Sequence, residues 1–168
     1  MAVAMASSQG RITRRELSVR TGLRRVTLAA MPNEALLTAV KSIVADARSG
    51  KLDEAYLGYR DLFASPAFST YEAHDQRQAL RLMVHAKGLP KPLSPAVLEA
   101  HRTAVGPLTD MVSKHNEPAD YEMLGMCHVA VGNEEGAAAV FRAGLDLERA
   151  RNAQSDLCGA FMRRISML

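Results

Sequence analysis

Apolar residues recur every three to four positions through most of the chain after residue 33, which is the spacing of one face of an α-helix. The first such stripe contains Leu36, Leu37, Val40, Ile43, Val44 and Ala47. Further stripes follow in segments 52–64, 71–87, 95–112, 118–131, 134–147 and 155–168. No segment shows the strict alternation of a half-buried strand, so the pattern predicts an all-α protein of seven helices.

Capping residues supply the expected helix boundaries. Asn33, Ser94, Asn133 and Ser155 each precede an apolar stripe and can accept hydrogen bonds from free backbone amides. Ser69 and Glu72 have the spacing of a capping box, which predicts that the third helix begins there and runs to about Lys87. Gly106-Pro107 lies inside the fourth stripe and predicts a kink or a break.

The first six stripes form three pairs, and one glycine lies between the two stripes of each pair: Gly50, Gly88 and Gly132, at intervals of 38 and 44 residues. Each pair would form a helical hairpin, and a hairpin with one apolar face needs a stacked neighbour to cover it. The segment after Ser155 would then cap the last open face. An unrelated antiparallel helical bundle is the alternative arrangement.

The hairpin 121–147 resembles a tetratricopeptide (TPR) repeat, through Tyr121, Leu124, Gly125, His128, Gly132, Ala137, Phe141 and Gly144. Segment 36–66 matches in part, through Gly50, Ala55 and Tyr59, and segment 71–112 matches weakly, with His101 and Ala104 at the positions of an aromatic and a small residue. The resemblance implies about three antiparallel hairpins stacked as a short right-handed TPR-like solenoid, with a C-terminal capping helix.

The resemblance also implies a function, because TPR arrays bind a peptide or a helix in a concave groove. The groove positions would be Val40, Val44, Arg48, Gln78, Leu82, His85, Glu122, Met126 and Val129. The paired cations with which some TPR domains hold a C-terminal carboxylate are absent, because Arg48 is nearly the only cation among these positions. A mostly apolar groove with Met126 favours an apolar or amphipathic segment. Burial of Leu82, Met126 and Val129 between hairpins is the competing interpretation.

Charge divides the chain into two parts. The formal net charge is +3, and the first 30 residues contain six arginines against the single acid Glu16, so the remainder carries −2. Residues 1–31 are therefore expected to be a disordered basic arm before a helical domain at 32–168. The same composition also fits an organellar transit peptide, or a segment that binds nucleic acid or an acidic surface through residues 11–25.

Catalytic and metal-binding motifs are missing from the sequence. The five histidines include no HExxH pair, no glycine-rich phosphate loop is present, and Cys127, His128 and Cys158 lack a fourth zinc ligand. Two cysteines without CxxC spacing favour a reducing compartment, and no apolar run is long enough for a membrane span. We therefore expect a cytoplasmic protein without enzymatic activity, metal or cofactor.

The sequence thus predicts a protein–protein interaction adaptor or scaffold. Association with nucleic acid through the basic arm is one alternative. An enzyme or a small-ligand site between hairpins is a second, and a homo-oligomer formed through the C-terminal helix is also open.

Overall fold

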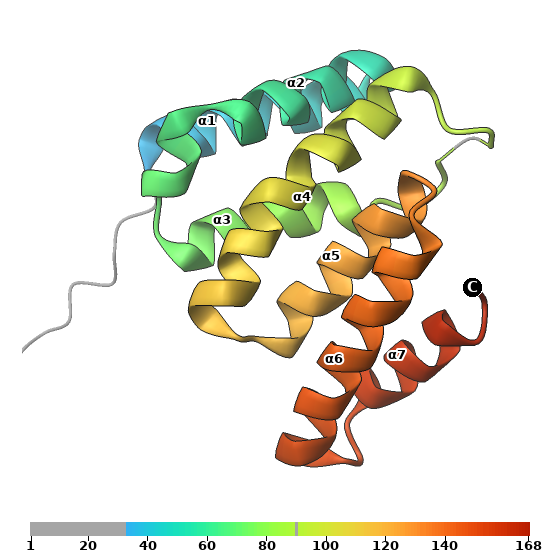
Figure 1. Ribbon diagram of the computed structural model, residues 1–168. Helices are drawn as coiled ribbons and strands as arrows, with labels where there is room; N and C mark the ends of the chain where they lie inside the picture. The colour runs from blue at the N-terminus through green and yellow to red at the C-terminus, as the bar shows by residue number, and fades with distance from the viewer. Residues whose placement is uncertain (1–32, 90) are drawn as a thin grey trace, which may run out of the picture.

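The computed structural model describes residues 33–89 and 91–168, and within these ranges the chain is all-α (Figure 1). The predicted all-α class and the seven helices are confirmed over the described residues, and one 3₁₀ helix is added. The elements are α1 (Glu34–Arg48), α2 (Leu52–Ala64), η1 (Pro66–Thr70), α3 (Ala73–Val84), α4 (Pro95–His115), α5 (Pro118–Ala130), α6 (Glu134–Asn152) and α7 (Asp156–Ile165). The predicted basic arm, residues 1–31, lies outside the described residues.

Four of the predicted caps are confirmed, because local chemistry is sufficient to place them. The side chain of Asn33 accepts from the amides of Ala35 and Leu36, at 3.0 and 3.4 Å. Ser94, Asn133 and Ser155 accept in the same way from amides three residues further on, at 3.4, 2.9 and 3.2 Å. Gly50, Gly88 and Gly132 have φ of +82°, +76° and +78°, which is the left-handed conformation that favours glycine after a helix.

The predicted capping box at Ser69 and Glu72 is wrong. Ser69 lies within η1, where its hydroxyl donates to the carbonyl of Pro66 at 2.9 Å, and α3 begins only at Ala73. The reason is Phe68, which is 1% exposed and packs edge-on against Phe63 with ring centroids 5.0 Å apart. Burying this ring requires a separate turn, and α3 ends at Val84 instead of Lys87.

The break predicted at Gly106-Pro107 does not occur, since α4 is continuous from Pro95 to His115. A proline inside a helix removes one backbone hydrogen bond. Buried residues on both sides, Ala104 and Leu108, are each 0% exposed and hold the helix against the core.

The helices pack as two hairpins joined by a central helix. α1 pairs with α2, and α5 pairs with α6, while α4 lies between α2 and α5 and contacts both. In Figure 1, α3 lies behind α4, and it contacts α5 more than it contacts α4. The middle hairpin expected from the repeat is therefore only loosely paired. α7 covers α6, and none of the described helices is long and apolar enough to span a membrane.

Two apolar clusters form the interior. The larger one draws on α1 to α5 and η1, and the smaller one joins α6 to α7 through Ala137, Phe141, Leu145, Cys158 and Phe161. Met126 is only partly buried and packs against both clusters. Its surroundings therefore lie where the last hairpin meets the rest of the domain.

Candidate functional site

An apolar surface pocket of about 400 Å³ lies where α5, the α3–α4 loop and the end of α7 meet. This volume is within the range of about 300–1,000 Å³ typical of ligand pockets. In Figure 1, the α3–α4 loop and the C-terminus lie on the same side of the molecule. The lining residues are mostly apolar: Val84, Ala86, Leu89, Lys91, Leu93, His101, Met126, Val129, Ala130, Phe141, Arg164, Met167 and Leu168.

Two of the predicted groove residues, Met126 and Val129, line this pocket. Val129 is 45% exposed, so its side chain is available to a partner. Met167, at the pocket edge, is 84% exposed, which means that the described end of the chain does not fill the pocket. Leu168, which also lines the pocket, is exposed as well, so the apolar lining reaches the molecular surface.

Two further predicted residues, His85 and Glu122, lie beside Arg164 of this pocket. Arg164 donates through Nε and Nη2 to Oε1 of Glu122, at 3.0 and 2.7 Å, and so ties α7 to α5. His85 Nε2 lies 3.9 Å from Oε2 of the same carboxylate. Burial lowers the pKa of His85, Glu122 raises it, and Arg164 and Arg81 lower it further. The net shift is downward, so His85 is neutral at pH 7 and Glu122 balances Arg164 alone.

The edge of the pocket is basic. Lys91 lines the pocket, and Lys87 lies in the sequence between the lining residues Ala86 and Leu89. Among the described residues that line the pocket, none is Asp or Glu. Both lysines are exposed, and within residues 33–89 and 91–168 neither forms an ion pair. The chain after the arm has a formal charge of −2, so this basic edge contrasts with the domain around it.

The other predicted groove residues lie elsewhere, on the α1 and α3 surfaces. Val40, Val44 and Arg48 line a shallow hollow along α1. Gln78 and Leu82 line a second hollow with Val40, between α1 and α3. Leu82 is 48% exposed. The structure thus brings together His85, Glu122, Met126 and Val129, and places the other five residues in neighbouring hollows.

Sequence reasoning missed the residues that complete the pocket from outside α5. Leu89, Lys91 and Leu93 belong to a proline-containing loop, and Arg164, Met167 and Leu168 belong to the end of the chain. The apolar spacing at Leu89 and Leu93 in a segment that cannot be helical was the available signal. Their approach to Met126 depends on the packing of α7 and α4, which the sequence pattern does not specify.

His101 lies in the wall of this pocket and is 4% exposed. Its Nδ1 is 2.8 Å from the carbonyl oxygen of Val97, which can only accept, so Nδ1 carries the proton. The ring stacks on Tyr56 with centroids 5.9 Å apart. Burial lowers the pKa of His101, so its ring is neutral and adds no charge to the pocket at pH 7.

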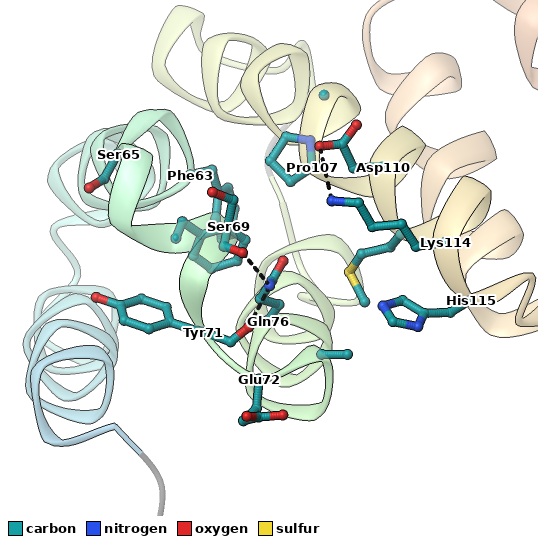
Figure 2. Close-up of a pocket in the computed structure, with 14 residues that line it drawn as sticks. Phe63, Ser65, Ser69, Tyr71, Glu72, Gln76, Pro107, Asp110, Lys114 and His115 are labelled. Carbon is teal, nitrogen blue, oxygen red and sulfur yellow. Dashed lines mark hydrogen bonds and ion pairs between the residues drawn. The ribbon is translucent and has the colours of Figure 1, made fainter.

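A second pocket, of about 440 Å³, is more polar (Figure 2). Figure 2 shows Pro107, Asp110, Lys114 and His115 of α4 on one side, facing Tyr71, Glu72 and Gln76 across the hollow. Its polar groups have structural or solvated roles. Gln76 donates to the carbonyl of Tyr71 at 2.7 Å. Lys114 Nζ lies 3.8 Å from Oδ2 of Asp110, and the side chains of this ion pair are both more than 60% exposed.

Cys127 and Cys158 are buried in different apolar clusters, and burial raises the pKa of the Cys127 thiol to about 12. His128 lies at the surface, with Nδ1 3.2 Å from the side-chain nitrogen of Asn133. Over the described part of the chain, no three His, Cys, Asp or Glu residues form a group able to hold a metal ion.

Comparisons with protein-family models, with characterised proteins and with solved structures gave no match to this chain.

Proposed function

We propose that this protein is a non-catalytic adaptor that binds a segment of another protein in the pocket around Met126 and Val129. One observation carries the proposal: the apolar lining of the pocket reaches the molecular surface through exposed apolar side chains, including Val129 at 45% and Leu168 at 39% exposure. A small ligand would fill the deeper part of the hollow and leave these exposed side chains in water. A peptide or a helix would cover both.

The TPR-like solenoid is part of the same proposal, supported by the close approach of α5 and α6. A Cβ built on Gly125 would collide with the ring of Phe141, so these helices touch through a small residue and a large one. The loose pairing of α3 with α4 departs from a regular repeat. It leaves α3 beside α5, where both helices can contribute to one binding surface.

Binding of displayed peptides tests this function directly. A random 16-residue peptide library on phage is selected on the full chain, and each recovered peptide is then measured against Val129→Glu. We expect to recover peptides that bind the Val129→Glu variant roughly tenfold or more weakly than the wild type, because a carboxylate at the centre of an apolar contact must be desolvated. Fluorescence anisotropy of labelled peptides provides the measurement.

Met162→Glu is the matched control. Met162 is 48% exposed on α7 and is not among the residues that line the pocket, so the same acidic change there should leave binding intact. Circular dichroism checks that each variant keeps its helices. Recovery of no peptide that depends on Val129 would contradict the proposed function.

A further inference from the structure

The apolar surface at Met126 and Val129 is bordered by cations, and this bears on what covers it. Lys91 and Arg164 line the pocket, and Lys87 lies between two of its lining residues. Among the described residues, Arg164 is paired with Glu122, whose Oε1 accepts both of its hydrogen bonds. Lys87 and Lys91 form no ion pair with any of the described residues, so their charge faces solvent.

We infer that the occupant is an acidic amphipathic segment of another protein, with apolar side chains in the pocket and carboxylates beside Lys87 and Lys91. This inference rests on the proposed function and adds the chemistry of the partner. Complementary charge at the edge of an apolar contact speeds association and rejects partners of the wrong sign. The guanidinium of Arg164 also keeps Nη1 for an acceptor, since its two bonds to Glu122 use Nε and Nη2.

Charge also weighs against the chain's own arm as the occupant. Residues 1–30 hold six arginines and one glutamate, so the arm and the edge of the pocket repel each other. A second copy of this chain would bring the same lysines to a symmetric contact. An acidic segment from a different protein avoids both costs.

The composition of selected peptides tests the inference. From the same library, peptides that bind the full chain and lose affinity for Val129→Glu should contain more Asp and Glu than Lys and Arg, beside two or more large apolar residues. For the strongest acidic peptide, the double variant Lys87→Glu/Lys91→Glu should weaken binding roughly three- to tenfold at low salt. The weakening should shrink as salt is raised.

Lys41→Glu/Lys51→Glu is the control for net charge, because both lysines are exposed and lie outside this pocket. It changes the charge of the protein by the same amount, and it should leave the affinity of the acidic peptide within twofold. An equal loss in both double variants would overturn the inference by showing that only the overall charge matters.

The remaining outcomes separate the two proposals. Peptides that depend on Val129 but are neutral or basic would leave the adaptor function standing and overturn the acidic partner, with basic ones indicating the arm as occupant. A dimer in sedimentation velocity that Val129→Glu dissociates would make a second copy the occupant and also overturn it. Absence of any peptide that depends on Val129 would contradict the proposed function itself.

Discussion

Single residues decide how closely the last hairpin can pack. A Cβ on Gly125 would collide with the ring of Phe141, and one on Gly144 would lie 2.6 Å from Phe161 and 2.7 Å from the Cβ of Tyr121. Gly125 and Gly144 are buried, and Phe141 and Phe161 meet edge-on with centroids 6.2 Å apart. These glycines therefore act through their size, and the hairpin depends on the absence of their side chains.

Gly125→Ala should lower the free energy of unfolding by about 1–3 kcal/mol, because the added methyl group overpacks a site filled by Phe141. Urea denaturation followed by circular dichroism measures the change. Gly159→Ala is the control: it lies in α7, and a Cβ there meets only the flexible end of the Arg163 side chain, at 3.3 Å, so the substitution should be neutral or stabilising. Equal stability of Gly125→Ala and the wild type would contradict the packing described for α5 and α6.

At the scale of elements, one ion pair attaches α3 to α5. Arg77 donates through Nε and Nη2 to the two carboxylate oxygens of Asp120, at 2.6 and 2.7 Å. The carboxylate of Asp120 is 0% exposed, and the hydrogen bond to it raises the pKa of Arg77. Since α3 pairs only loosely with α4, this bidentate contact is a main determinant of where α3 lies.

Asp120→Asn should lower the free energy of unfolding by about 2–4 kcal/mol, because it leaves the guanidinium of Arg77 partly buried beside a neutral amide. Thermal and urea unfolding measure the loss. The exposed pair of Lys114 and Asp110 provides the comparison, and Asp110→Asn should cost less than about 1 kcal/mol. If the two variants lose the same stability, the Arg77–Asp120 pair does not anchor α3.

For the whole molecule, three histidines make stability depend on pH. Burial lowers the pKa of His101 and of His128, and burial together with Arg164 and Arg81 lowers that of His85 despite the opposing effect of Glu122. A lowered folded-state pKa means that the unfolded chain takes up protons first as the pH falls. The contribution of each histidine is therefore complete above the unfolded pKa of about 6.5 and is lost as the pH falls through the folded pKa.

We expect the free energy of unfolding to fall between pH 7.5 and pH 5, and His101→Phe to flatten part of this slope. Phenylalanine keeps the stacking on Tyr56 but does not titrate. Urea unfolding at several pH values gives the slope, and His74→Phe is the control at an exposed position. A slope unchanged in His101→Phe would show that this ring does not contribute to it.

By itself, the sequence determined the local features of this protein. The helical stripes and the caps at Asn33, Ser94, Asn133 and Ser155 depend on residues within a few positions, so they were predictable. It also indicated Met126 and Val129 as groove residues, although the role of the groove stays a prediction. The sequence alone likewise shows that positive charge is concentrated in residues 1–30, while the arm itself stays a prediction.

Only the tertiary structure decided how these elements meet. Burial of Phe68 replaced the expected start of the third helix with a separate 3₁₀ turn, and buried neighbours kept α4 continuous through Pro107. The pocket itself required Leu89 and Arg164, which lie far from Met126 in sequence, to approach it through the packing of α4 and α7. An apolar stripe specifies that a face avoids water, but the long-range contacts of the folded chain decide which stripe is covered and which remains exposed.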